Sequence, residues 1–188
     1  MRLSYSSINT YETCPAKFKF QYEDRVPQAR SAALPFGDSL HGALHMFHNR
    51  AVPVPHSTAE LQDMLEASWV SDGFGDASEE QTYRDHGRQV LAQYHRENAE
   101  NYRIPAALEF RFTIEVEGVA LSGVIDRMDR IPGGGYEIVD YKTNRRLPPQ
   151  SRARRQRMAV RPPPRASRQA VRSARLVMLE WPMAERRS

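Results

Sequence analysis

Several features that define whole classes of protein are scarce or missing in this sequence. Its 188 residues include one cysteine, Cys14, which excludes an internal disulfide framework and any four-cysteine cluster or zinc site. No run approaches the roughly 18 apolar residues of a membrane span, and the N-terminus lacks an apolar signal-peptide core. We therefore expect a soluble cytoplasmic protein with no membrane partner. No G-x-x-x-x-G-K-S/T phosphate loop is present, so any ATP hydrolysis must come from elsewhere.

Charge is distributed very unevenly along the chain. Residues 145–188 hold 13 of the 27 basic residues and 2 of the 23 acidic ones, a net charge of +11, which leaves residues 1–144 with −7. Before residues 176–179 this basic end shows little apolar periodicity, a composition typical of disorder. We expect one domain over residues 1–144 and an Arg- and Pro-rich tail over residues 145–188.

The most informative stretch is residues 123–143, which are predicted to form two strands joined by a Pro-Gly-Gly turn. Counting outward from that turn sets Asp126 opposite Asp140, with Lys142 two residues further along the same face. Opposed carboxylates repel, so one acid needs a raised pKa, a nearby cation or a bound metal. Mg²⁺ suits the pair because it favours one or two carboxylates together with phosphate oxygens. The pattern indicates a metal-dependent site that cleaves phosphodiesters.

The preceding segment extends the pattern to three antiparallel strands. Residues 108–116 alternate apolar and polar side chains, and a Glu-Gly turn leads into residues 119–125. The same counting places Glu109 opposite Asp126. Glu109, Asp126 and Asp140 are therefore expected to form a row of acids across the sheet.

The two faces of this sheet should differ in character. One bulge would move the residues of a strand to the other face, so the assignment depends on register. The alternative is that the acids are ordinary surface charges balanced by Arg111, Arg127 and Lys142. The face opposite the acids is expected to pack in the core, through Phe110, Phe112, Ile114, Val116, Leu121, Ile125, Val139 and Tyr141.

The sequence before these strands is predicted to be helical. Pro15 should separate two short helices at the N-terminus, with Ser6 or Ser7 as the first N-cap. Asp38 is the expected N-cap of the next helix. Apolar periodicity gives the helical ranges as residues 3–22, 36–49, 58–70 and 78–102.

The second of these ranges carries His41, His45 and His48 on one side of a helix. One histidine that reaches the acidic row would complete a site suited to Mn²⁺ as well as Mg²⁺. A zinc site on the pair His41 and His45 is an alternative, and partly exposed polar residues are another.

Four segments, in this order and spacing, resemble the RecB-like branch of the PD-(D/E)XK nuclease superfamily. They are residues 3–15 (LSYSSINTYETCP), 36–41 (FGDSLH), 123–129 (GVIDRMD) and 138–143 (IVDYKT). The resemblance implies a restriction-endonuclease-like α/β fold, with a mixed sheet flanked by helices. It also implies a Mg²⁺-dependent DNA nuclease that acts in recombination and repair, often attached to a helicase subunit or domain.

The resemblance assigns roles to individual residues. Lys142 would be the catalytic lysine, and Glu109 fits an acid often found on the first strand. Some relatives hold an iron–sulfur cluster on four cysteines, which Cys14 alone excludes; Cys14 itself is expected to be a small buried residue. The implied metal ligands are His41, Asp126, Asp140 and the backbone carbonyl of Tyr141.

After Thr143 the chain departs from the family pattern, which usually continues with a helix carrying Gln-x-x-x-Tyr and further strands. No Tyr or Phe follows Tyr141. The tail is either a DNA-binding arm whose arginines pair with phosphates, or an out-of-frame translation that replaces the normal end, which we favour. The expected function is a nuclease with incomplete C-terminal support, and the alternative is a non-catalytic DNA-binding or scaffold module.

The out-of-frame hypothesis predicts a specific feature of the gene. A single-base insertion or deletion near the codon for Thr143 should restore a patterned helix with Gln-x-x-x-Tyr, which the nucleotide sequence will reveal. If no single-base change restores that helix, the basic tail belongs to the natural chain.

Overall fold

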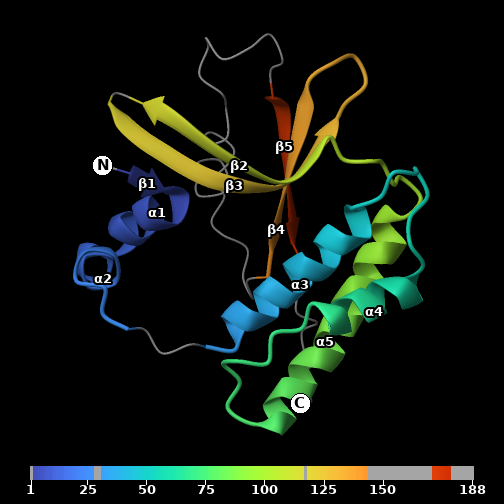
Figure 1. Ribbon diagram of the computed structural model, residues 1–188, viewed down its shortest axis with the longest axis horizontal. Helices are drawn as coiled ribbons and strands as arrows, with labels where there is room; N and C mark the ends of the chain where they lie inside the picture. Colours follow the sequence, from blue (N-terminus) through green and yellow to red (C-terminus); the bar gives the residue numbers. More distant parts are fainter. Residues whose placement is uncertain (1, 28–30, 117, 144–170, 179–188) are drawn as a thin grey trace, which may run out of the picture.

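A computed structural model of the chain describes residues 2–27, 31–116, 118–143 and 171–178. These form a mixed five-stranded sheet and its helices, which confirms the expected α/β class (Figure 1). In chain order the elements are β1 (Arg2–Ser4), α1 (Tyr5–Thr13), α2 (Pro15–Phe18), the π-helical turn η1 (Lys19–Glu23), α3 (Ala33–His48), α4 (Thr58–Ala67), α5 (Ala77–Asn98), β2 (Ala107–Val116), β3 (Val119–Arg130), β4 (Tyr136–Lys142) and β5 (Val171–Met178).

Strand β3 organises the sheet because both of its edges are paired. β2 runs antiparallel along one edge, and the other edge pairs with β1 in parallel and then with β4 in antiparallel orientation. Arg127 lies opposite Val139, and Phe110 opposite Ile125. Both predicted registers are therefore confirmed, and they bring Asp126 beside β2 and β4.

Strand β5 corrects one expectation about the tail. Val171–Met178 pairs in parallel along the whole of β4, so the absence of regular structure expected over residues 145–188 is wrong for this segment. The segment contains most of the apolar run noted in the sequence, and apolar residues with a free strand edge beside them favour pairing. The rest of the tail lies outside the described residues.

Local signals explain the first helices, with two corrections. α1 ends before Cys14 and Pro15 opens α2, as predicted. The first N-cap is Ser4, not Ser6 or Ser7, because residues 2–4 form a strand; the Ser4 side chain accepts a hydrogen bond from the Ser7 N–H, and the Ser7 side chain accepts one from the Ser4 N–H. Cys14 is exposed rather than buried, since it lies in the link between two helices that bury little.

Of the later helices, α4 begins at Thr58 as expected, whereas α3 and α5 begin earlier than expected, at Ala33 and Ala77. α3 begins at Ala33, so Asp38 lies inside the helix and does not cap it. Pro35 is tolerated there because an N–H in the first turn has no intrahelical partner. Ser57 caps α4 in a reciprocal capping box, and Asp76 caps α5.

The core lies between the sheet and helices α3, α4 and α5. Val139 and Tyr141 join it from β4 as predicted, whereas Phe110 is 46% exposed, so the predicted core face is wrong at that position. The helices cover the β4 side of the sheet, and the turn end of the β2–β3 hairpin extends beyond them, over α1 (Figure 1). The core cluster is Phe36, Leu40, Ala43, Leu44, Phe47, Leu61, Leu65, Val90, Leu91, Tyr94, Val139 and Tyr141.

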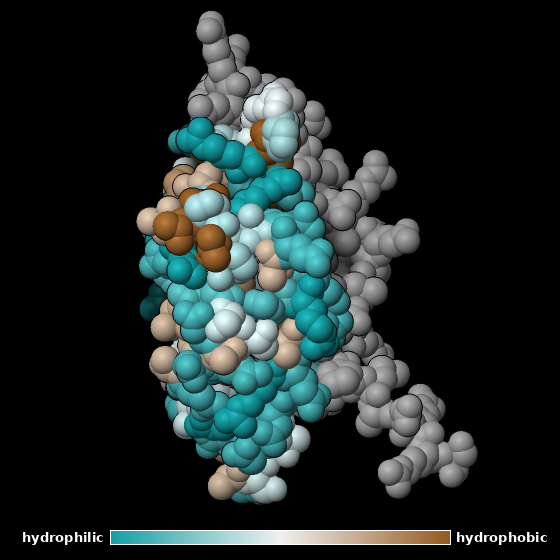
Figure 2. Space-filling view, turned by 90° about the vertical axis from the view of Figure 1, so that its right-hand side faces the viewer, coloured by the Kyte–Doolittle hydropathy of each residue, from teal (hydrophilic) through white to brown (hydrophobic). Residues whose placement is uncertain are grey.

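The face of the molecule on the right-hand side of Figure 1 is mostly polar. Figure 2 shows the right-hand side of Figure 1 as a largely hydrophilic face, with apolar residues gathered mainly in a small group in its upper half. Within the described ranges, no helix combines the length and the apolar character needed to cross a membrane.

A charged network is enclosed in the core. The Nε atom of Arg127, a residue only 8% exposed, donates to Asp129 at 2.9 Å. Its Nη1 donates to Nε2 of His48 at 2.9 Å and to the hydroxyl oxygens of Tyr94 and Tyr141 at 3.1 and 3.4 Å. Burial alone would lower the pKa of Arg127, but Asp129 and the two tyrosines raise it, so the guanidinium stays charged. The interpretation of Arg127 as a surface charge is therefore wrong.

His48 is a neutral member of this network. Burial and the charge of Arg127 lower the pKa of His48 to about 2. Because a guanidinium can only donate, Nε2 of His48 accepts and Nδ1 carries the hydrogen. This Nδ1 is the one buried side-chain polar atom that lacks a hydrogen-bond partner in the described part of the chain.

Removal of the carboxylate at Asp129 should destabilise the fold strongly. Asp129→Asn leaves the buried Arg127 cation without its counter-charge, so we expect a loss of about 3–5 kcal/mol in the free energy of unfolding, measured by urea titration. The control is Asp85→Asn, which breaks an exposed ion pair with Arg88 and should cost less than about 1 kcal/mol. Equal losses in the two variants would contradict the structural role of the network.

Candidate active site

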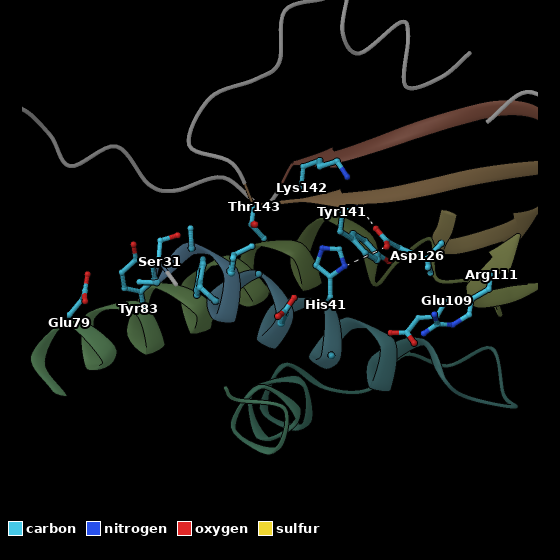
Figure 3. A pocket seen from close by; sticks show the side chains of 18 residues that line it. Ser31, His41, Glu79, Tyr83, Glu109, Arg111, Asp126, Tyr141, Lys142 and Thr143 are labelled. Atoms are coloured by element: carbon cyan, nitrogen blue, oxygen red, sulfur yellow. Dashed lines mark hydrogen bonds and ion pairs between the residues drawn. The ribbon is translucent and has the colours of Figure 1, made fainter. Parts of the chain in front are cut away.

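A pocket of about 970 Å³ lies where α3 faces β2, β3 and the end of β4 (Figure 3). Five of the six residues selected from the sequence line it, and Asp140 is not among the described residues of its wall. Glu79 and Tyr83 of α5 lie at the opposite end of the pocket from Glu109 and Arg111 (Figure 3). The five residues are His41, Glu109, Asp126, Tyr141 and Lys142.

Asp126 is held by two neighbouring elements. Its Oδ1 lies 3.5 Å from Nδ1 of His41 on α3, and its Oδ2 accepts a hydrogen bond of 2.8 Å from the backbone N–H of Tyr141 on β4 (Figure 3). The His41 ring packs edge-on against Tyr141, with centroids 5.9 Å apart. One carboxylate thus joins α3, β3 and β4.

These contacts shift the pKa values of Asp126 and His41 in the directions that favour their charged forms. Burial raises the pKa of Asp126, but the contacts with His41 and the Tyr141 N–H bring it below its usual value. Burial lowers the pKa of His41, but Asp126 raises it above its usual value. At neutral pH Asp126 is therefore an ionised carboxylate.

Asp140 is paired with Lys142 rather than with the pocket. Lys142 Nζ lies 2.7 Å from Oδ1 of Asp140 and 2.6 Å from its Oδ2. Burial raises the pKa of Asp140, the ammonium of Lys142 opposes this, and the charge of Asp126 raises it further. The repulsion between Asp126 and Asp140 is expected to require a raised pKa, a nearby cation or a bound metal. The first two are present, as the raised pKa of Asp140 and the ammonium of Lys142.

Glu109 has an unusual backbone conformation beside the acids. Its φ of 46° lies in the left-handed region, which costs a non-glycine residue roughly 1 kcal/mol or more. The pairs Leu108–Arg127 and Phe110–Ile125 on either side keep one register, so no residue is inserted. Glu109 lines the same pocket as Asp126, although the two are not paired in the ladder.

The donor set fits a divalent cation that needs few protein ligands. In the parts of the chain that are described, no three His, Cys, Asp or Glu side chains lie together as a complete metal site. His41 and Asp126 still present one imidazole nitrogen and one carboxylate oxygen, 3.5 Å apart, to the pocket. Mg²⁺ keeps several waters and binds through one or two carboxylates and substrate phosphates, and Mn²⁺ also accepts imidazole.

Sequence reasoning missed the buried ion pair of Arg127 and Asp129, which lies on the other face of the sheet from Asp126. In the predicted register, Arg127 and Asp129 share a face with Val139 and Tyr141, the apolar side of the sheet. Two charged residues at core positions were the available signal for a buried ion pair. The contribution of α5 to the pocket, through Glu79 and Tyr83, has no comparable signal in the sequence.

Comparison with known proteins gives one clear result. The sequence matches the PD-(D/E)XK nuclease superfamily over residues 2–162. The match includes all six selected residues and runs past residue 144 into the basic tail. A search of curated proteins found no match.

Relief of the backbone strain at Glu109 should stabilise the protein. Glu109→Gly should raise the free energy of unfolding by about 1 kcal/mol in urea titrations, because glycine adopts a positive φ without steric cost. The control is Glu115→Gly, at an exposed position of the same strand with no positive φ, where a loss of about 0.5–1 kcal/mol is expected. Destabilisation by both substitutions would show that Glu109 is not strained.

Proposed function

Because the chain belongs to the PD-(D/E)XK nuclease superfamily, we propose that it hydrolyses phosphodiester bonds of DNA with Mg²⁺ as cofactor. The observation that carries this proposal is that His41, Asp126 and Lys142, from three separate elements, line one pocket. The order of the four sequence segments supports the RecB-like exonuclease type, with a cytoplasmic role in DNA repair and recombination. A helicase subunit or domain is the proposed partner.

The proposed metal ligands are His41 and Asp126, joined by Asp140 and the backbone carbonyl of Tyr141. When bound, a divalent cation polarises the scissile phosphate and lowers the pKa of a bound water. Mn²⁺ is proposed as a substitute for Mg²⁺, since imidazole and carboxylate suit both ions in this combination.

Lys142 is proposed to act on the reacting atoms. Its ammonium is half-buried beside Asp140, which fixes its position through contacts of 2.6 and 2.7 Å. From there it donates a hydrogen bond to the attacking water or to a phosphate oxygen, where negative charge increases in the transition state. A fixed cation stabilises that charge without reorganising during the reaction.

The acids of the pocket have complementary proposed roles. Asp126 stays ionised because His41 and the Tyr141 N–H lower its pKa, so it offers a negatively charged oxygen of fixed orientation. Glu109 is exposed and lines the same pocket, where it is proposed to accept a hydrogen bond from a water beside the scissile phosphate. Burial by a bound strand strengthens each of these interactions.

A non-catalytic DNA-binding or scaffold module is the second candidate. Two observations favour it. Asp140 accepts a hydrogen bond from Lys142, and no three potential metal ligands lie together among the described residues. Such a module would bind DNA in a salt-dependent way without cleaving it.

Cleavage assays on single- and double-stranded DNA distinguish these candidates. With Mg²⁺, wild type should degrade DNA, EDTA should stop the reaction, and added Mg²⁺ or Mn²⁺ should restore it. Asp126→Asn and Lys142→Ala should each reduce the rate about a hundredfold or more. The exposed residues Asp63 and Lys17 provide matched controls, since Asp63→Asn and Lys17→Ala make the same chemical changes at positions that do not line the pocket.

Two results would argue against the proposal. Activity that survives in Asp126→Asn would exclude the proposed site. Salt-sensitive DNA binding by wild type with no cleavage under any metal would favour the binding module.

A further inference from the structure

A second cavity, of about 340 Å³, lies further along α3. Its polar wall is the end of α3 and the two residues that follow, and an apolar wall comes from the segment before β2, with Ile104, and from the start of β2, with Leu108. A narrow hollow shares His41, Glu109 and Asp126 with the active-site pocket, and His45 and Leu108 with the second cavity, so the three spaces form one track along α3. The polar residues of the second cavity are His45, His48, Asn49 and Arg50.

The two ends of this track differ in charge. Carboxylates from Asp38, Glu79, Glu109 and Asp126 line the active-site pocket, whereas the described residues of the second cavity include no acid. Arg50 is half-buried there, and no described carboxylate lies within ion-pair distance of its guanidinium. Hydrogen-bond donors therefore gather in the second cavity without a negative partner.

His48 gives an independent indication of a ligand. It is 2% exposed, lines the second cavity, and its Nδ1 has no hydrogen-bond partner. Because Arg127 donates to Nε2, this Nδ1 carries a hydrogen and is a buried donor. A buried donor without an acceptor is costly, so a residue in the wall of this cavity has an unused hydrogen-bond donor.

We propose that the second cavity binds a backbone phosphate of the DNA strand whose scissile phosphate lies in the active-site pocket. Resting on the proposed nuclease function, this assigns Arg50 and Asn49 as binding residues away from the reacting atoms. Along α3, His45 lies about 6 Å and Asn49 about 12 Å from His41 at 1.5 Å per residue. At about 3.4 Å per nucleotide, these distances of about 6 to 12 Å correspond to roughly two to four nucleotides.

The apolar wall completes a nucleotide-binding surface. Ile104 is 42% exposed and lies beside Pro105 and Leu108, opposite the donors of α3. A phosphate on the donors leaves the attached sugar or base against these apolar side chains. The arrangement favours a nucleotide within a strand over an isolated inorganic anion.

Binding measured in EDTA tests this assignment without any cleavage. The probe is a fluorescein-labelled single-stranded oligonucleotide of about ten nucleotides, with anisotropy followed over a range of salt concentrations. Arg50→Ala should weaken binding about tenfold, the expected loss of one charge-assisted contact. The slope of log K against log salt should fall by about 0.7, the value for one phosphate contact on a single strand.

Matched variants separate this contact from a general charge effect. Arg96→Ala removes the same charge from an exposed position on α5 outside both cavities and should change Kd and slope little. Arg50→Lys should keep the slope, and Asn49→Ala should weaken binding with the slope unchanged. Urea unfolding midpoints equal to that of wild type should verify that each variant is folded.

Three outcomes would overturn the proposal. The first is equal binding by Arg50→Ala and Arg96→Ala, and the second is no oligonucleotide binding by wild type. The third is that Arg50→Ala weakens the binding of a nucleoside monophosphate as strongly as the binding of the oligonucleotide. The cavity would then be a site for a released product. Failure of the nuclease function is a separate result: wild type would not cleave with Mg²⁺, while the binding in EDTA could still be measured.

Discussion

The buried guanidinium of Arg127 is the constraint on which the site depends. A cation in the core must be paired, and Asp129 supplies the counter-charge while His48, Tyr94 and Tyr141 take the remaining hydrogen bonds. Tyr141 transmits this constraint to the pocket. Its hydroxyl accepts a hydrogen bond from Arg127 and its backbone N–H donates one to the carboxylate of Asp126, so this one residue links the core network to the pocket.

Strand alternation explains how one hairpin serves both purposes. Successive side chains of β3 and β4 point to opposite faces, so Arg127 and Tyr141 enter the core while Asp126 and Lys142 line the pocket. Each site residue therefore has an immediate neighbour packed in the core. In this hairpin the cost of opposed charges is offset by packing behind the acids and by Lys142 beside them.

The sequence was sufficient where short-range rules decide the outcome and insufficient where distant packing does. The register of β2, β3 and β4 follows from two short turns and strict alternation, so the placement of Asp126 relative to β2 and β4 could be counted. The exposure of Phe110 depends on how far the helices extend over the sheet, which no local pattern encodes. The pairing of β5 depends in the same way on a free edge of β4. The catalytic and metal-binding roles of the pocket residues remain predictions.

The two proposals share one electrostatic basis. The active-site pocket is lined by carboxylates, which favour a bound cation, and the second cavity is lined by the donors Asn49 and Arg50, which favour a bound anion. A free metal ion satisfies only the first end of the track and a free anion only the second. A nucleic-acid strand with a divalent counter-ion at one phosphate satisfies both ends at once. Such a ligand neutralises opposite charges at two places along α3, so its binding at one place favours binding at the other.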